Sequence, residues 1–309
     1  MITINTPFYP MEPETFPQAF DDPEFGFQIK WDGTRILAHV SREVKLFNRK
    51  KKLRTLQYPE IANRLAGIFK GRKLVLDGEI VTLANGKPSF QLLMRRDRAS
   101  DPAAVKSLMA RIPVTYVVFD ILYLDGKELV SLPFQERDRL LKSLIPSQDP
   151  VVVADTFPLT GTTLFSVVKQ RGLEGIVAKR LDSRYEAGRK SRKWLKIKNR
   201  RLLDATIGGY LADSRRIRSL LLGIFQDGDF IYIGRAGSGL KEAEGRALYD
   251  FLSKYRLASC PFNIVPPPFA GENPCWVEPW LDVRVEYLDF TDEGCLRHPV
   301  IKGINWTAD

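Results

Sequence analysis

The sequence predicts an α+β fold with antiparallel sheets, followed by a second domain that is mostly β. Strand-like runs alternate with helical patterns in the first part, and the character changes near residue 200 to short strands with glycine-rich turns. We therefore expect a first domain at 1–200 and a second at 201–309. The predicted strands of the first domain are 27–40, 74–83, 116–124 and 174–180, and its predicted helices are 134–144 and 164–171.

The second domain has the pattern of a small barrel. Its predicted strands are 205–211, 219–225, 230–234 and 283–290. One amphipathic helix is expected at 240–255, between the third and the last of these strands. About five strands with one inserted helix suit a Greek-key barrel of the OB type, which is a common platform for nucleic acids.

The composition is that of an ordinary globular protein. A chain of 309 residues with 44% hydrophobic residues can bury a core in each domain. No apolar run approaches the roughly 18 residues of a membrane span, and the N-terminus lacks the regions of a signal peptide, so a cytoplasmic location is expected. Cys260, Cys275 and Cys295 match no compact zinc module in their spacing, and we expect reduced thiols in ordinary packing.

The net charge of +10 is concentrated and favours a polyanionic partner. Between 179 and 201 basic residues far outnumber the acidic ones, and 49–54 and 95–98 add two smaller clusters. The segment 234–240 is either a turn near nucleic acid or a plain structural loop, because its glycine spacing is wrong for a dinucleotide fingerprint. The residues that we expect to contact DNA are Lys179, Arg180, Arg184, Arg189, Arg192 and Arg235.

The run Lys30-Trp31-Asp32-Gly33-Thr34-Arg35 carries the first chemical signal. A lysine is unusual within a strand-like stretch, and Asp32-Gly33 is a tight-turn dipeptide. Lys30 is therefore expected at a strand end, with Arg35 starting the next strand and both facing one pocket. The alternative is a solvated hairpin with charges at its tip.

Four downstream segments follow this run in order, and together they carry a family resemblance. They are Asp77-Gly78-Glu79, Phe119-Asp120, Glu174-Gly175-Ile176-Val177-Ala178-Lys179 and Trp194-Leu195-Lys196-Ile197-Lys198. With them the chain resembles ATP-dependent DNA ligases of the covalent nucleotidyltransferase superfamily along essentially all of its length. Lys-Trp-Asp-Gly, Phe-Asp-Ile-Leu-Tyr-Leu-Asp-Gly and Leu-Arg-His-Pro resemble the ligase domain of bacterial end-joining ligases. The resemblance implies an adenylation domain at 1–200 followed by an OB-fold at 201–309.

The chemistry of nucleotidyl transfer explains these residue types. A lysine phosphoramidate forms and later breaks readily, so Lys30 suits the nucleophile that takes AMP from ATP. A free lysine is protonated near neutral pH, and the neighbouring cations Lys196, Lys198 and Mg²⁺ would favour its neutral form. Carboxylates are needed for Mg²⁺, for which Mn²⁺ can substitute, and Glu79 and Glu174 are the expected pair.

The resemblance also implies contacts with the nucleotide. Phe119 is expected to stack on adenine, although an isolated Phe in an apolar strand would more often be core. Glu79 is expected near the ribose as well as the metal. The full set of expected nucleotide contacts is Gln28, Ile29, Arg35, Arg49, Glu79, Phe119, Lys196 and Lys198.

Two positions depart from the family pattern. Most relatives have Glu where this chain has Gln28, so a weaker preference for ATP over GTP is expected, although an amide oxygen still accepts a hydrogen bond. Relatives end their barrel with R-x-D-K, which closes over pyrophosphate, whereas this chain reads Gly303-Ile304-Asn305-Trp306-Thr307-Ala308-Asp309. We therefore expect a slow or partner-dependent first step, with Arg297 or Lys302 as substitutes.

The sequence thus predicts an ATP-dependent DNA ligase of DNA repair. Its expected substrate is nicked or broken duplex DNA, its expected partner a Ku-like end-binding protein, and its expected state a monomer. An RNA ligase or capping-type nucleotidyltransferase shares the Lys30 chemistry and remains an alternative. A non-catalytic module that holds DNA ends is a second alternative.

Overall fold

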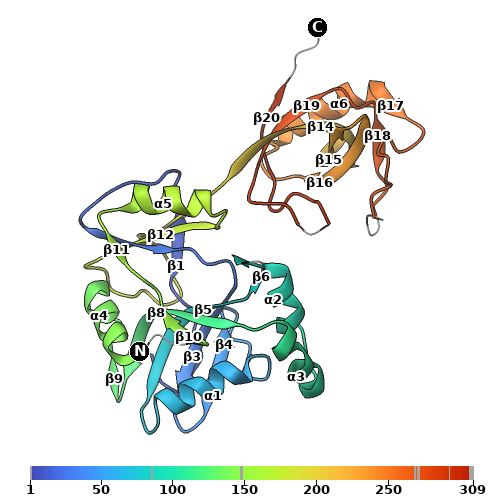
Figure 1. Cartoon of the computed structure of the whole chain (residues 1–309). Helices are drawn as coiled ribbons and strands as arrows, with labels where there is room; N and C mark the ends of the chain where they lie inside the picture. The colour runs from blue at the N-terminus through green and yellow to red at the C-terminus, as the bar shows by residue number, and fades with distance from the viewer. Residues whose placement is uncertain are drawn as a thin grey trace. The chain divides into compact units, whose positions relative to one another are not determined.

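The computed structural model describes residues 2–84, 86–146, 149–267, 269, 272–291 and 293–305. The chain forms two compact units, Met1–Asn199 and Arg200–Asp309, which Figure 1 shows and which we describe separately. No helix in the described ranges is both long and apolar enough to cross a membrane. Residues 306–309 of the C-terminal departure lie outside the described part of the chain.

The first unit contains two sheets that face each other. The first sheet consists, in spatial order, of β1 (Glu12–Thr15), β13 (Lys190–Lys198), β12 (Gly175–Arg180), β2 (Phe25–Ile29) and β11 (Phe157–Pro158). The second consists of β10 (Val151–Val153), β8 (Thr115–Leu124), β5 (Leu74–Val81), β3 (Thr34–Val40) and β4 (Val44–Asn48), with β9 (Lys127–Glu128) beside β8. β6 (Leu83–Ala84) and β7 (Lys87–Pro88) form a separate hairpin.

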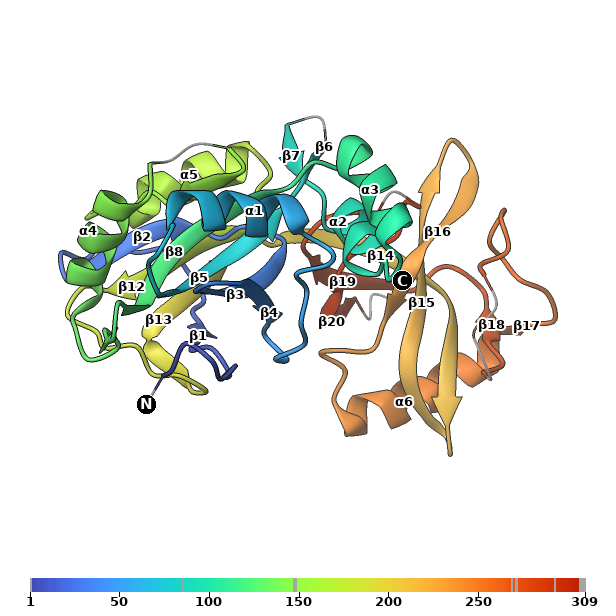
Figure 2. The same cartoon turned by 90° about the horizontal axis from the view of Figure 1, so that it is seen from below.

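Helices cover the outer faces of both sheets. They are α1 (Pro59–Ile68), α2 (Phe90–Asp97), α3 (Pro102–Arg111), α4 (Phe134–Leu144) and α5 (Gly161–Gln170). Figure 2 shows α1 lying across the second sheet, where Ile61 and Leu65 join a core with Ala38 and Leu76. α5 packs Leu164 and Val168 against the first sheet. The faces that remain, turned toward each other, are free to carry polar side chains.

Two sequence predictions about these sheets need correction. The sheets are not purely antiparallel, because β1 runs parallel to β13 and β10 runs parallel to β8. The run 27–40 is divided at Asp32-Gly33 as predicted, but β2 and β3 on its two sides belong to different sheets. The Lys30–Gly33 segment is therefore a crossover between sheets, which rules out the hairpin alternative. Gly33 is required there, because a Cβ would lie 2.1 Å from the carbonyl oxygen of Ile80.

The second unit is the OB-type barrel. Its strands are β14 (Arg201–Asp213), β15 (Arg216–Gln226), β16 (Asp229–Ala236), β17 (Arg256–Leu257), β18 (Cys275–Val277), β19 (Asp282–Tyr287) and β20 (Val300–Asn305). The long strand β14 curves enough to pair with β15, β18 and β19. α6 (Glu242–Leu252) ends earlier than predicted, in a 3₁₀ turn at Ser253–Tyr255, and packs Leu248 and Leu252 into the barrel core.

The cysteines are not joined in disulfides. Cys260, Cys275 and Cys295 are free thiols. No group of three or more His, Cys, Asp or Glu side chains that could hold a metal occurs in the described part of the chain.

A buried histidine on β3 makes the stability of the first unit sensitive to acid. His39 is 2% exposed, its Nδ1 donates to the carbonyl oxygen of Ile4 (2.8 Å), and Nε2 has no partner among the described residues. Burial lowers the pKa of His39 below its ordinary value. The unfolded chain therefore binds this proton at higher pH than the folded protein, and stability is lost as pH falls below about 6.5.

We expect His39→Asn to weaken this acid sensitivity. Asn can donate to Ile4 but does not titrate, so the variant, although less stable at pH 7.5, should lose less unfolding free energy between pH 7 and 5 than the parent. Urea unfolding at a series of pH values measures both slopes. Equal losses in the two proteins contradict the assignment.

Candidate active site

The register of the first sheet places the predicted nucleophile among cations. Gln28 on β2 pairs with Val177 on β12, and Val177 pairs with Lys196 on β13. The amide of Lys30 donates to the carbonyl of Gly175 (2.9 Å), which pairs with Lys198. Because alternate residues of a strand share a face, the side chains of these two rows lie on the same side of the sheet.

Glu174 holds the two lysines of the second row together. Lys30 Nζ lies 2.6 Å from Glu174 Oε2, and Lys198 Nζ lies 3.5 Å from Glu174 Oε1. Partial burial, together with the positive charges of Lys198 and Lys30, lowers the pKa of Lys196. Three ammonium groups and one carboxylate thus share a small, partly dehydrated space, which suits a polyphosphate ligand.

Glu79 reaches the same space from the second sheet. It pairs with Arg35 across β5 and β3. Loss of hydration raises the pKa of Glu79 to about 8; the carboxylates of Glu174 and Asp77 add to this, while Lys30 and Arg35 oppose it. Two carboxylates that repel each other across a slot are a donor set that fits Mg²⁺, which commonly binds one or two protein carboxylates together with substrate phosphates.

Arg35 lies deeper than the sequence suggests. Its guanidinium binds Asp77 through two hydrogen bonds of 2.9 and 2.6 Å, and Asp77 also accepts from the Tyr185 hydroxyl (2.7 Å). The guanidinium carbon lies 5.3 Å from the centre of the Phe119 ring. Arg35 therefore supports Phe119, while its charge is paired with that of Asp77.

Lys179 corrects a sequence prediction. We expected this lysine to contact DNA, but it is 2% exposed and its Nζ donates to the carbonyl of Phe119 (3.0 Å). The ammonium lies 4.4, 4.7 and 4.2 Å from the ring centres of Phe119, Phe134 and Trp194. Burial lowers the pKa of Lys179 to about 7, against the attraction of Asp120. The prediction was wrong because β12 turns alternate residues inward, and Lys179 shares its inward face with Val177.

The other predicted DNA contacts lie at the surface. Arg184, Arg189 and Arg192 are exposed, and the side chain of Arg192 is 89% exposed with one ion pair to Glu14 (3.3 Å). Arg180 pairs with Asp182 (2.8 Å). In the second unit, Arg235 pairs with Glu272 (3.1 Å). None of these exposed pairs holds its arginine firmly, so all remain available to phosphates.

Arg49 lies in a tight basic turn after β4. Asn48 Oδ1 accepts from the amides of Lys50 and Lys52, both at 3.0 Å, and Lys51 adopts a left-handed conformation with φ of 62°. The turn displays its cations to solvent. Arg49 itself contacts none of the site residues described above.

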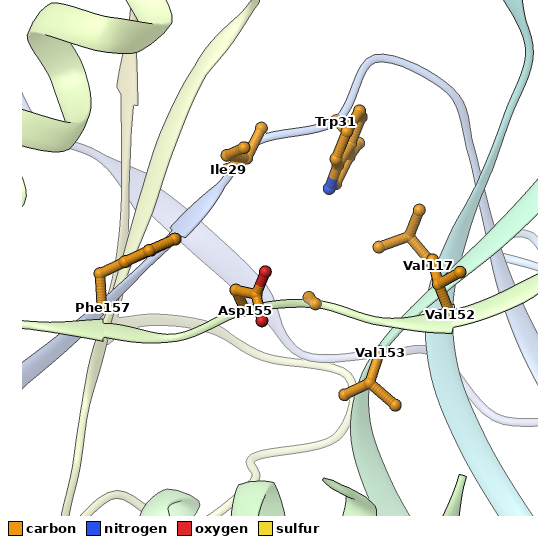
Figure 3. A pocket seen from close by; sticks show the side chains of 8 residues that line it. Ile29, Trp31, Val117, Val152, Val153, Asp155 and Phe157 are labelled. Atoms are coloured by element: carbon orange, nitrogen blue, oxygen red, sulfur yellow. The ribbon is translucent and has the colours of Figure 1, made fainter. Parts of the chain in front are cut away.

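A cavity of about 330 Å³ opens beside the crossover (Figure 3). Ile29 and Trp31 line one side, Val117 and Val152 another, and Asp155 is the one acidic residue of its lining. Ile29 thus borders a hollow next to the crossover. The segment 152–157 carried no motif, so sequence reasoning missed its contribution to this cavity.

Sequence reasoning also missed the partners of Gln28. Gln28 is 2% exposed, and its Nε2 donates to Thr156 Oγ1 (2.8 Å). Thr156 in turn donates to Asp138 Oδ1 (2.9 Å). Thr156 and Asp138 are separated from Gln28 by more than a hundred residues, so only the fold reveals this connection.

Comparison with known proteins agrees with this geometry. The profile of the ATP dependent DNA ligase domain matches residues 11–198, and that of the ATP dependent DNA ligase C terminal region matches residues 213–306. The chain belongs to the ATP-dependent DNA ligase family. The boundary between the two matches lies close to the division between the two compact units.

Individual relatives of this ligase chain include end-joining proteins. It is 33% identical over 287 residues to the multifunctional non-homologous end joining protein LigD of Mycobacterium bovis, which covers 91% of the chain and 36% of the relative. It is 32% identical over 235 residues to a DNA ligase of Thermococcus fumicolans, covering 72% and 42%. The chain therefore spans about a third of the length of that LigD protein.

Solved structures agree as well. The ligase domain of Mycobacterium tuberculosis LigD is 31% identical, with a TM-score of 0.58, and the match covers 96% of this chain and 95% of that domain. A mycobacterial DNA ligase D complexed with ATP and MES is 32% identical with the same TM-score, and its match covers the same shares, 96% and 95%. A Lig E DNA ligase, 17% identical with a TM-score of 0.64, covering 96% of this chain and all of that one, shares the fold.

The burial of Lys179 predicts how salt affects DNA binding. Arg192→Ala should remove one phosphate contact and reduce the slope of log K against log salt by about 0.9. Lys179→Met, which keeps the buried volume, should leave that slope unchanged. Titration of a nicked duplex at several salt concentrations gives both slopes. A reduced slope in Lys179→Met would contradict the buried position.

Proposed function

We propose that this chain seals 5′-phosphate/3′-hydroxyl breaks in duplex DNA with ATP, through a lysyl-AMP intermediate on Lys30. The observation that carries the proposal is the 2.6 Å contact between Lys30 Nζ and Glu174, beside Lys196 and Lys198 on one sheet face. The order of the motifs along the chain and the family to which the chain belongs support the same chemistry.

The first step follows from this arrangement. Lys30 gives up a proton to solvent, and its amine attacks the α-phosphorus of ATP. The new N–P bond forms as the bond to pyrophosphate breaks. Lys196 and Lys198 balance the negative charge of the phosphates, so that most of the catalysis is positioning and electrostatics.

The carboxylates define where a cation belongs. Glu79 and Glu174 would hold Mg²⁺, or Mn²⁺ in its place, and the ion when bound neutralises phosphate charge. Glu79, which lies on the opposite sheet, is also expected to bind a ribose hydroxyl. Glu79 and Glu174 thus face the proposed nucleotide site from its two sides.

The base is expected in the same slot. Phe119 is the aromatic residue expected to stack on adenine; its ring is contacted by Lys179 and Arg35, and Val177 lies on the opposing sheet. Gln28 pairs with Val177 across β2 and β12. A flat purine placed between the Phe119 ring and the Val177 side chain would pack against both.

Exposed basic residues are proposed to bind the DNA substrate. The exposed arginines of 184–192, the turn at 49–52 and Arg235 on the OB-fold are suited to duplex phosphates without reading sequence. Similarity to LigD proteins favours a role in end joining. A Ku-like partner and action as a monomer belong to the same proposal. The Leu-Arg-His-Pro segment and the LigD relatives favour DNA over the RNA ligase or capping alternative.

The C-terminal departure bears on the first step alone. Lys302, a predicted substitute for the missing basic residues, forms an ion pair with Glu286 on the neighbouring strand (3.1 Å). A nick that already carries AMP does not need pyrophosphate to be expelled. We therefore propose that sealing of pre-adenylylated nicks is better retained than sealing from ATP.

Nick sealing tests this function. The protein should seal a nicked DNA duplex with Mg-ATP, and should seal the pre-adenylylated form faster. Lys30→Ala should abolish sealing from ATP, by at least about a thousandfold as for the loss of a nucleophile, and retain sealing of the pre-adenylylated nick.

Matched duplexes separate the alternatives. Faster sealing of RNA strands than of DNA strands supports the RNA-ligase alternative, and binding without any sealing of either nick supports the non-catalytic module. Equal rates on ordinary and pre-adenylylated nicks would refute the proposed weakness of the first step.

A further inference from the structure

The strongest unassigned feature is a chain of hydrogen bonds that begins at Gln28 and ends at the surface. Gln28 Nε2 donates to Thr156 Oγ1 (2.8 Å), and the Thr156 hydroxyl contacts Asp138 Oδ1 (2.9 Å). The other oxygen of Asp138 accepts from Lys142 Nζ (2.7 Å), one turn along α4. We call Thr156, Asp138 and Lys142 the amide relay.

The direction of each hydrogen bond in the amide relay is fixed by chemistry. An ionised carboxylate only accepts, so Asp138 must receive the single hydroxyl proton of Thr156. Lys142 donates to the other carboxylate oxygen (2.7 Å). Thr156 therefore has only lone pairs to offer Gln28, and the amide must turn its NH₂ group toward Thr156.

This orientation leaves the carbonyl end of the amide for a ligand. No described residue donates to Gln28 Oε1. Gln28 is almost fully buried and lies two residues before Lys30 on the same sheet face, beside Val177. A ligand that donates to Gln28 Oε1 would therefore gain a hydrogen bond in a largely dehydrated place.

We propose that the amide relay makes this ligase selective for ATP over GTP by locking Gln28 as a hydrogen-bond acceptor. Adenine carries a donor amino group where guanine carries an acceptor oxygen. A free glutamine could turn over and donate to guanine, but here the turned amide would set its oxygen against the lone pairs of Thr156. The inference rests on the proposed function and reverses the sequence expectation of a weaker preference for ATP.

The amide relay thus places the carboxylate of Asp138 two hydrogen bonds from Gln28. Thr156, Asp138 and Lys142 are positioning residues, since they act through Gln28. A site that must leave buried polar groups unpaired in order to accept the wrong ligand discriminates strongly.

The test compares lysyl-nucleotide formation from ATP and from GTP. The parent should prefer ATP in kcat/KM. Thr156→Val and Asp138→Asn should each lower the ATP/GTP ratio by about tenfold, the equivalent of about 1.4 kcal/mol for one hydrogen bond. Thr156→Ser keeps the hydroxyl and should keep the ratio. Glu136→Gln, the same acid-to-amide change at an exposed position of α4, is the matched control and should change nothing.

A rescue experiment separates the amide relay from general damage. In Asp138→Asn, the new amide can donate to Thr156, which frees the hydroxyl proton to point toward residue 28. Adding Gln28→Glu then supplies a carboxylate that accepts from Thr156 and cannot donate to guanine. The double variant should recover the ATP/GTP ratio, whereas Gln28→Glu alone should weaken nucleotide binding because acceptors face each other.

The outcomes are distinct. A parent without preference, ratios unchanged in Thr156→Val and Asp138→Asn, or a loss that Gln28→Glu does not reverse each overturn the amide relay. If the parent forms no lysyl-nucleotide at all, the proposed function fails. Equilibrium binding of ATP and GTP to the same variants, by calorimetry, then decides the amide relay with the same expected ratios.

Discussion

The structure depends on one constraint, which is that charged groups between two facing sheets must pair with one another or with a ligand. Removing a charge from water costs several kcal/mol, so a buried ion needs a partner. Arg35 binds Asp77, Arg137 binds Asp120, and Lys179 is held by three aromatic rings. Of these pairs, Lys30–Glu174 is the one that we propose is broken when the nucleotide binds.

The same constraint separates support from chemistry. Arg137 and Asp120 are both fully buried, and they tie α4 to β8. The side chains of Lys30 and Glu174 keep 22% and 10% of their surface exposed. The inner pairs hold Phe119 and β5 in place, and the outer pair stays within reach of a nucleotide. The fully buried pairs thus position the site, whereas the partly exposed pair is the one proposed to react.

The sequence predicted which charged residues come together better than it predicted their surroundings. Lys30, Glu79, Glu174, Lys196 and Lys198 were expected at one site because nucleotidyl transfer needs these residue types in this order, and they lie close to one another. The burial of Lys179 was not, since strand direction and sheet pairing decide which side of β12 faces inward. The turn at Asp32-Gly33 was predictable, but alternation does not show that the strands before and after it join different sheets. Thr156 and Asp138 act only through distant contacts that local patterns do not record.

The central claim is that Lys30, and no other lysine of this crowded face, becomes bonded to AMP. Peptide mapping by mass spectrometry after incubation with Mg-ATP tests it directly, since Lys196 and Lys198 lie close enough to compete. We predict a single adenylated peptide that contains Lys30. AMP on Lys196 or Lys198, or no adduct on any lysine, would contradict this account.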